Sequence, residues 1–474
     1  MFPIRLTDRL DGGRTRIMLI SPTGPLSHAT GRLAAEIAAL AAGFGEAGEA
    51  LLVPRPLRRP ALLVLAGVGE GGEDGWRAAG AAACREVPGD EPLQVTIDGP
   101  VSANAVRGLA EGLWLGGYRY RDGREEPRTA EVTLVTGGYR AYAGSLARAE
   151  ATARATWLAR DLANAPASVK NPDWLAEELV GAAAKRPGVQ IGIRSGAELD
   201  RFGGLRAVGG GSVSPPCLVE LTWQPSDARR HVALVGKGIT FDTGGISIKS
   251  REGMRRMKID MTGAAVVAAA TLAAADLALP VRVTAVLPLA ENAVGANAFR
   301  PGDVITHYDG STSESTNSDA EGRLVLADAL GYAVAELDPD VIIDVATLTG
   351  ANTVALGHRT AALYSHNDDL AGALAEAGRL AGERMWRLPL PDDYREYLRS
   401  DLADRHSSPV GGAGSVVAAL YLAEFLGAKA GDWAHLDMAA PAWAETSELE
   451  ITRGATGWGA RTLTRYLEAV ALSA

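Results

Sequence analysis

The chain has 474 residues, carries a formal net charge of −10 and contains only 5% aromatic residues. This length exceeds one average domain, and the acidic balance argues against the basic face of a nucleic-acid-binding protein, so we expect no nucleic-acid partner. The apolar stretch at residues 261–275 is too short to span a membrane, which predicts a buried helix and no membrane partner. The N-terminus lacks a signal-peptide pattern and no CxxC pair occurs, so we expect a reducing, cytoplasmic location.

The first 148 residues alternate apolar runs with turns and helical segments. Apolar runs predict strands at residues 16–20, 61–66 and 130–135, and periodic segments predict helices at residues 31–42 and 76–87. This alternation indicates a mainly parallel α/β layer. Because no catalytic constellation occurs here, we assign residues 1–148 to a separate N-terminal α/β domain.

A second α/β region follows a connecting helix. Helical periodicity over residues 145–164 predicts that helix, and we place the connecting segment at residues 149–168 and the larger C-terminal domain at residues 169–474. Its predicted strands lie at residues 189–193, 217–223, 232–235, 281–288 and 341–347. Its predicted helices lie at residues 172–184, 264–275, 324–335, 369–381 and 415–425. We therefore expect a mixed sheet flanked by helices, with ligands bound at the carboxyl ends of its strands.

The most informative motif is residues 317–324, Asn-Ser-Asp-Ala-Glu-Gly-Arg-Leu. In an extended or tightly turned backbone, side chains two apart point the same way, so Asp319, Glu321 and Arg323 would converge. Clustered carboxylates repel one another unless a cation lies between them, so the motif indicates a metal site beside a bound anion. The alternative is a polar turn that opens the following helix.

Two further segments supply matching side chains. Residues 236–249 carry Lys237, Asp242 and Lys249 in a glycine-rich loop after a predicted strand, and Asp260 precedes an apolar helix. Four acids, two lysines and one arginine thus lie in three loops that could form one site. The segment around Lys237 lacks the spacing of a phosphate-binding loop, and neither an H-E-x-x-H pair nor a G-x-S-x-G elbow occurs.

Together these segments resemble the leucyl aminopeptidase (cytosol aminopeptidase) family of two-metal exopeptidases. The resemblance covers about residues 158–467 and includes the Gly-Lys-Gly-Ile-Thr-Phe-Asp element at residues 236–242. It implies a macrodomain-like N-terminal α/β domain involved in assembly and a C-terminal catalytic domain. The chain departs from the family pattern at Thr262, where a smaller residue is usual and where the β-branched side chain could change substrate fit.

The resemblance also implies the role of each site residue. Asp242 and Glu321 would bridge two divalent ions, Lys237 and Asp260 would complete the tight site, and Asp319 the exchangeable one. The ions would be Mn²⁺ or Zn²⁺, with Co²⁺ or Mg²⁺ as alternatives at the exchangeable position. They would activate a water molecule, while Lys249 would stabilise the oxyanion and a bicarbonate held by Arg323 would accept the proton. Without metal, Lys237 would form salt bridges with the acids. For Lys249 and Arg323 the alternative is likewise an ordinary ion pair with a nearby acid.

Substrate contacts are implied for Met257, Ala439 and Asn317. Met257 and Ala439 are apolar, which favours a neutral, leucine-like N-terminal residue, although either could belong to the core. We therefore expect a cytoplasmic metalloprotease of the aminopeptidase type, a hydrolase that acts on peptides and forms a homohexamer. The alternatives are a hydrolase specialised for thiol-containing dipeptides and a non-catalytic protein of the same fold, including a DNA-binding regulator.

Overall fold

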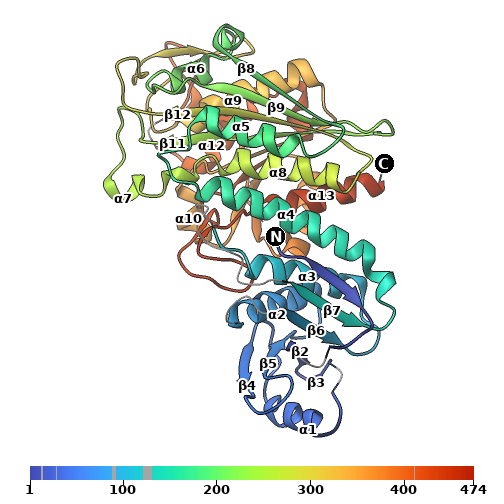
Figure 1. The fold of residues 1–474 in the computed structure, drawn as a ribbon. Helices are drawn as coiled ribbons and strands as arrows, with labels where there is room; N and C mark the ends of the chain where they lie inside the picture. The colour runs from blue at the N-terminus through green and yellow to red at the C-terminus, as the bar shows by residue number, and fades with distance from the viewer. Residues whose placement is uncertain (12–13, 28, 88–91, 121–130, 410, 474) are drawn as a thin grey trace. The chain divides into compact units, whose positions relative to one another are not determined.

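The structure is a computed structural model that describes residues 1–11, 14–27, 29–87, 92–120, 131–409 and 411–473. The chain divides into two compact units, one formed by Met1–Trp157 with Ala444–Gly454 and the other by Leu158–Trp443 with Ala455–Ala474. Both units combine sheets with helices, which confirms the expected α/β class (Figure 1). The boundary between Trp157 and Leu158 falls inside helix α4 (Ala143–Asn164).

The first unit is built on a mainly parallel sheet. Its strand order is β1 (Ile4–Thr7), β7 (Val132–Thr136), β6 (Leu93–Ile97), β2 (Thr15–Ser21), β5 (Leu62–Gly67) and β4 (Ala50–Pro54), with β3 (Gly24–Pro25) beside β2. Neighbours from β1 to β5 run parallel, whereas β4 and β3 are antiparallel to their partners. The helices are α1 (Gly31–Leu40), α2 (Glu73–Glu86) and α3 (Ala103–Gly116). The predicted strand at residues 130–135 corresponds to β7, although residue 130 lies outside the described part of the chain.

Helices α2 and α3 approach each other so closely that glycine is required between them. A Cβ on Gly112 would lie 2.0 Å from the backbone oxygen of Arg77, and one on Gly108 would lie 2.2 Å from that of Glu73. Any larger residue would force the helices apart. This contact explains why a helix rich in glycine is stable here despite its poor intrinsic propensity.

The second unit is built on a nine-stranded mixed sheet. Its order is β17 (Met385–Arg387), β16 (Ala361–Tyr364), β19 (Trp433–Asp437), β15 (Val341–Ala346), β10 (His231–Gly236), β12 (Arg282–Asn292), β9 (Cys217–Trp223) and β8 (Val189–Ser195), with β11 (Gly238–Asp242) beside β12. The central strands β19, β15, β10 and β12 are parallel. Their carboxyl ends therefore meet at one edge of the sheet.

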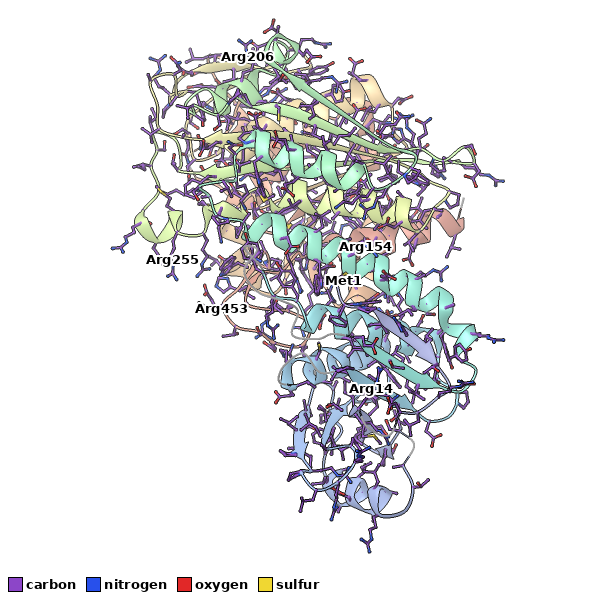
Figure 2. All side chains as sticks on the ribbon, viewed as in Figure 1. Met1, Arg14, Arg154, Arg206, Arg255 and Arg453 are labelled. Carbon is purple, nitrogen blue, oxygen red and sulfur yellow. The ribbon has the colours of Figure 1, made fainter. Side chains whose placement is uncertain are left out.

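Two groups of helices cover this sheet (Figure 1). Helices α5 (Pro172–Ala183) and α13 (Ala460–Ser473) pack with α8 (Thr262–Asp276), and α6 (Gly203–Gly209) and α12 (Gly414–Ala423) pack with α9 (Glu321–Tyr332). Helix α11 (Asp368–Ala381) packs on α13. The outer surface of this unit carries long charged side chains such as Arg206 and Arg255 (Figure 2).

Helix α8 is the buried apolar helix that the sequence predicts. Every residue from Thr262 to Ala274 is buried. The segment Met257–Asp276 is long and apolar enough to cross a membrane, but 89% of its most apolar window is buried inside the protein. It therefore belongs to the core.

The strands and helices predicted for the C-terminal region match β8, β9, β10, β12 and β15, and α5, α8, α9, α11 and α12, within a few residues. Two differences bear on the site. Residues 238–242 form strand β11 instead of a loop, because they pair with β12. Helix α9 begins at Glu321, three residues earlier than predicted.

Candidate metal centre

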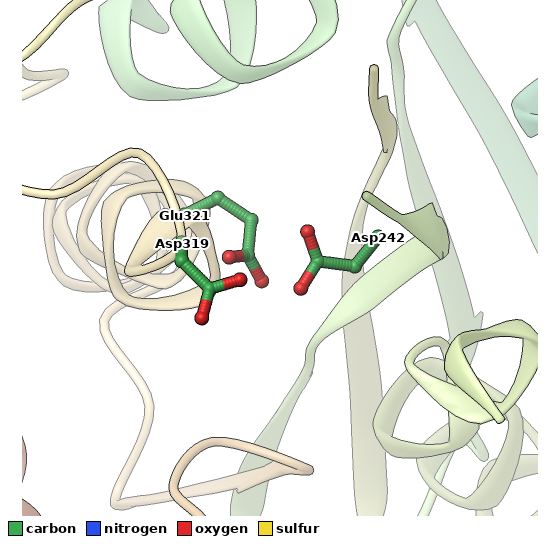
Figure 3. Close-up of side chains that lie close together, drawn as sticks. All are labelled: Asp242, Asp319 and Glu321. Atoms are coloured by element: carbon green, nitrogen blue, oxygen red, sulfur yellow. The ribbon is translucent and has the colours of Figure 1, made fainter. Parts of the chain in front are cut away.

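Three carboxylates meet at the carboxyl edge of the large sheet. One oxygen from each of Asp242, Asp319 and Glu321 lies within 4.8 Å of the others. Figure 3 shows the three carboxyl groups facing a common point. Asp242 is the last residue of β11, and Glu321 is the first residue of α9. Asp242 and Glu321 are buried and Asp319 is half-buried, so the acids are close to one another and largely shielded from water.

The start of α9 sets the directions of the motif's side chains. The side-chain oxygen of Asn317 accepts the backbone N–H of Asp319 at 3.0 Å, which fixes the turn before the helix. From Glu321 onward the chain is helical, and residues two apart in a helix point about 200° apart. The alternation expected for an extended chain therefore ends at Glu321, and Arg323 donates to the Ser407 backbone oxygen at 2.7 Å instead.

Two lysines lie among the acids. Lys237 Nζ lies 2.9 Å from Asp260 Oδ2 and 2.8 Å from Glu321 Oε1. Lys249 Nζ lies 2.7 Å from Asp242 Oδ2 and 2.5 Å from Asp319 Oδ1. The structure thus brings together all five residues predicted to bind metal, and Lys249 with them.

Burial disfavours the charged form of these acids. It raises the pKa of Asp242 to about 6 and also raises the pKa values of Asp260 and Glu321. Burial works against the Lys237 ammonium too, but Asp260 and Glu321 outweigh it and raise the pKa of Lys237 above its ordinary value. Lys237 is therefore protonated in the protein alone.

The chemistry of the cluster fits divalent cations. Four carboxylates face two ammonium groups, which leaves two formal negative charges in a mostly buried site. Glu321 Oε2 is buried and has no hydrogen-bond partner among the described residues. A buried carboxylate oxygen without a donor costs free energy, and hard divalent cations prefer such oxygens as ligands.

The motif residue Ser318 and two residues that sequence reasoning did not single out, Asn292 and Thr347, hold the loops in place. Asn292, at the end of β12, donates from Nδ2 to Asp242 Oδ1 at 2.7 Å and to the Ser318 backbone oxygen at 3.0 Å. Ser318 Oγ in turn donates to the Gly244 oxygen at 2.8 Å. Thr347 Oγ1 donates to Asp260 Oδ1 at 2.6 Å. Asn292 and Thr347 lie at or just beyond the carboxyl ends of β12 and β15, the one signal that could have identified them.

The predicted substrate residues lie on segments next to the acids. Met257 is half-buried in the turn that carries Asp260, whose N–H donates to the Met257 backbone oxygen at 3.3 Å. Ala439 is half-buried, and its N–H donates to Asp437 Oδ1 at 3.2 Å. Thr262 is fully buried and its hydroxyl donates to the Ile259 backbone oxygen, so it presents no polar group to a substrate.

Arg323 has a buried guanidinium nitrogen, Nε, without an acceptor among the described residues. The buried hydroxyl of Ser407 likewise has none in that part of the chain. Burial lowers the pKa of Arg323, which marks an environment where a positive charge is poorly compensated.

A second polar cluster has the spacing of a serine-protease triad but not its exposure. Ser313 Oγ lies 2.9 Å from His307 Nε2, and His307 Nδ1 lies 2.9 Å from Asp328 Oδ1. All three side chains are buried, and Tyr421 completes the network at 2.8 Å from Ser313. No substrate could reach this hydroxyl, so the network is structural.

Comparisons with known proteins identify the family of this chain. The model of the cytosol aminopeptidase family catalytic domain matches residues 157–464. A probable cytosol aminopeptidase of Chlorobaculum tepidum is 42% identical, with 86% of each chain covered, and one of Leifsonia xyli subsp. xyli is 42% identical, covering 92% of this chain and 90% of its own.

Solved structures give the same result. The bottromycin maturation enzyme BotP in complex with Mn has a TM-score of 0.86 at 40% identity, covering 97% of this chain and 100% of its own. The cytosol aminopeptidase from Coxiella burnetii has a TM-score of 0.84 at 32% identity, covering 98% and 99%. The chain therefore belongs to the cytosol aminopeptidase family and is a metal-dependent aminopeptidase, a hydrolase that acts on peptides.

Proposed function

We propose that this enzyme removes single neutral, apolar residues, leucine-like ones above all, from the amino termini of peptides at a two-metal centre. The supporting observation is the meeting of Asp242, Asp319 and Glu321 within 4.8 Å, with the Glu321 Oε2 atom buried and unbonded among the described residues. Such an oxygen cluster is suited to hold cations a few ångströms apart.

In this proposal Asp242 and Glu321 would be shared by both ions. Asp260 and Lys237 would hold the tighter ion, which requires that Lys237 give up its proton, and Asp319 would hold the more exchangeable one. We propose Mn²⁺ or Zn²⁺, with Co²⁺ or Mg²⁺ as alternatives at the exchangeable position; the Mn complex of BotP supports a divalent ion. When bound, the ions supply an activated water molecule and polarise the scissile carbonyl.

Lys249 is proposed as the oxyanion donor. Burial disfavours its ammonium, but Asp242 and Glu321 outweigh this and raise the pKa of Lys249, so it stays protonated. A preorganised cation in a site shielded from water stabilises a developing negative charge strongly. It lies 2.5 Å from Asp319 and 2.7 Å from Asp242, within reach of any group bound between them.

Arg323 is proposed to hold bicarbonate. The planar guanidinium fork matches the shape of a carbonate-type anion. The unbonded Nε of Arg323 and the neighbouring Ser407 hydroxyl supply two polar atoms for it. Removal of bicarbonate from the assay buffer should therefore lower turnover by the wild type but change little in Arg323→Ala.

The leucine-like preference depends on Met257 and Ala439, proposed to line the side-chain pocket with Asn317 near the peptide backbone. Both lining residues are apolar and half-buried. A panel of Leu-, Met-, Lys- and Glu-amides with Cys-Gly tests this. Fastest turnover of Leu- or Met-amide supports it, whereas dominant cleavage of Cys-Gly would identify a thiol-dipeptide hydrolase.

The decisive test of the centre is metal removal and replacement. Dialysis against a chelator should abolish hydrolysis of Leu-amide, and Mn²⁺, Zn²⁺ or Co²⁺ should restore it. Glu321→Ala should lower the metal content measured by elemental analysis, because a bridging ligand serves both ions. Full turnover by a verified metal-free preparation, or two ions retained in Glu321→Ala, would contradict the assignment.

Assembly and location complete the proposal. We propose a cytoplasmic homohexamer whose N-terminal domain, residues 1–148, is joined through residues 149–168 to the catalytic domain at residues 169–474 and serves assembly. The relatives' description as cytosol aminopeptidases supports the location. Light scattering tests the oligomer: a mass near the 49.3 kDa of one chain would refute it.

A further inference from the structure

Lys170 is a buried lysine of the second unit that the proposed mechanism does not use. Its side chain is 1% exposed. A buried ammonium group costs free energy unless hydrogen-bond acceptors replace the water that it loses. Helix α4 ends at Asn164, and Pro166 follows. The backbone N–H of Lys170 donates to the Pro166 oxygen at 3.1 Å, so a short turn brings this lysine back to the end of the helix.

Three backbone oxygens surround the ammonium group of Lys170. Its Nζ atom donates to the Leu162 and Ala163 oxygens at 2.8 Å each and to the Lys258 oxygen at 2.6 Å. The sulfur of Met261 lies 3.7 Å away. Burial and the nearby Lys258 charge lower the pKa of Lys170. Three acceptors at these distances nevertheless require three N–H donors, and only the ammonium form carries three.

Two of these oxygens belong to the last turn of α4. The last carbonyls of a helix have no partner within the helix and form the negative end of its dipole, so a lysine stabilises them. This end of α4 is itself held in place. Asn164 Oδ1 accepts the Ala455 N–H at 3.1 Å, and Arg160 Nε donates to the Thr456 oxygen at 2.8 Å. The end of α4 is therefore an anchored base within the second unit.

The third oxygen belongs to the turn that leads to Asp260. Lys258 lies in the short helical turn Met257–Ile259, directly before that acid. Its own side chain makes the reverse contact, since Lys258 Nζ donates to the Asn164 oxygen at 2.7 Å. Lys170 and Lys258, which we call the lysine pair, thus connect the turn to the end of α4 in both directions.

The position of this turn matters for the centre because the turn carries two of its proposed residues. Asp260 is buried, and its short side chain has few rotamers that could compensate for a displaced backbone. Asp260 Oδ2 lies 2.9 Å from Lys237 Nζ, so a shift of the turn would separate these two groups. Met257 begins the same turn.

We propose that the lysine pair positions the turn at residues 257–260, and that Lys170 and Lys258 are therefore positioning residues for the metal ligand Asp260. This inference rests on the proposed function, in which Asp260 holds the tighter ion. The lysine side chains act through the backbone, because their hydrogen bonds among the described residues go to backbone oxygens and, for Lys170, to the Met261 sulfur.

Competition with a chromogenic chelator for Mn²⁺ tests the proposal on the full-length, metal-loaded enzyme. Lys170→Met and Lys258→Met each remove the ammonium group and keep an unbranched side chain. Loss of a positive charge near the centre would by itself tighten cation binding, whereas loss of positioning weakens it, so the sign of the change separates the two effects. We expect both variants to bind Mn²⁺ about tenfold more weakly or worse, within the 10–100-fold range for lost orientation of a metal ligand.

Lys258→Met also covers the case in which Lys170→Met does not fold. Lys258 is half-buried, and its replacement leaves only the Asn164 oxygen without its lysine donor. Lys429→Met is the matched control. Lys429 Nζ donates to the Pro339 backbone oxygen at 2.8 Å, just before β15 begins and so at the opposite edge of the sheet from the acids. Its affinity for Mn²⁺ should equal that of the wild type.

Asp260→Asn separates the failure of this inference from the failure of the proposed function. If Asp260→Asn binds Mn²⁺ like the wild type, the proposed centre is wrong and this inference falls with it. If Asp260→Asn weakens binding but either lysine variant that folds binds Mn²⁺ at least as tightly as Lys429→Met, only the role of the lysine pair is refuted. Equal weakening in Lys429→Met would also refute it, because any lost lysine would then have the same effect.

Discussion

Asn292 is the residue whose replacement tests the geometry of the centre most directly. Its amide donates at 2.7 Å to Asp242 and at 3.0 Å to the Ser318 backbone, and so it links the two segments that supply the clustered acids. In Asn292→Ala, Asp242 Oδ1 keeps only the Gly244 N–H at 2.8 Å, and the Ser318 carbonyl loses its side-chain donor. Both hydrogens of the Asn292 amide are used in these two bonds, so the residue acts by positioning.

The size of the effect follows from these two bonds. A hydrogen bond to a charged acceptor contributes about 1.5–3 kcal/mol and a neutral one about 0.5–1.5 kcal/mol. Part of that loss appears as lower stability, and the part that loosens Asp242 appears as weaker metal binding. Removal of a partner that orients a metal ligand usually weakens the metal about 10–100-fold, and we expect this range for Asn292→Ala.

Competition with a chromogenic chelator measures the affinity for Mn²⁺ or Co²⁺ in both proteins. Asn171→Ala is a suitable control, because Asn171 accepts the Trp174 N–H at 2.8 Å as the N-cap of α5, a helix that supplies none of the four acids. The control should lower stability by about 1 kcal/mol without changing the metal affinity. If Asn292→Ala binds metal as tightly as the control does, Asn292 does not position Asp242.

Three further predictions concern the charged groups of the centre. Lys249→Ala should keep both ions yet lose roughly 10²–10³ in kcat, the scale for an oxyanion donor, and a kcat near that of the wild type would exclude that role. Arg323→Ala should lose roughly 10²–10⁴ in kcat, the scale of general acid–base assistance, with unchanged metal content as the check on its role. In the metal-free protein, the pKa of Asp242 is about 6 in the folded state, above its ordinary value of 3.8. Because the folded state holds this proton more tightly than the unfolded state, the free energy of unfolding falls as the pH rises from 3.8 to about 6. Since a cation removes that penalty, the gain in Tm on adding metal should grow from pH 4 to pH 6, and a gain that shrinks over this range would contradict the assignment of Asp242 as a ligand.

The sequence predicted the regular parts of the fold because their signals are local. Apolar runs and helical periodicity located the central strands β10, β12 and β15 and five helices of the second unit, but they missed the central strand β19 and helix α13. Helix α3 was missed because its glycines at positions 108 and 112 lower helix propensity, and only the close contact with α2 explains them. Strand β11 was missed because its pairing with β12 is a tertiary property that residues 238–242 do not reveal.

The candidate site was likewise predicted only in part from the sequence. The acids and lysines were found through the match of their short motifs to a family, because the residues alone left a polar turn as an alternative. Asn292 and Thr347 carry no such signal, because an amide or hydroxyl near a strand end is common in any sequence. Their importance comes from the parallel register of β10, β12 and β15, which brings three strand ends together. The motif also did not predict where the Arg323 side chain points, because that direction depends on the residue at which helix α9 begins.

Charge balance links the fold of the centre to its need for metal. If Lys237 and Lys249 were only structural partners, a stable buried cluster would need about as many cations as acids, because an unpaired buried charge is expensive. The four acids exceed the two lysines, and burial raises the pKa values of Asp242, Asp260 and Glu321 together. The protein alone therefore favours partial protonation of the cluster. Divalent cations make full ionisation favourable, so the burial that would shield a reaction from water also creates the demand for metal.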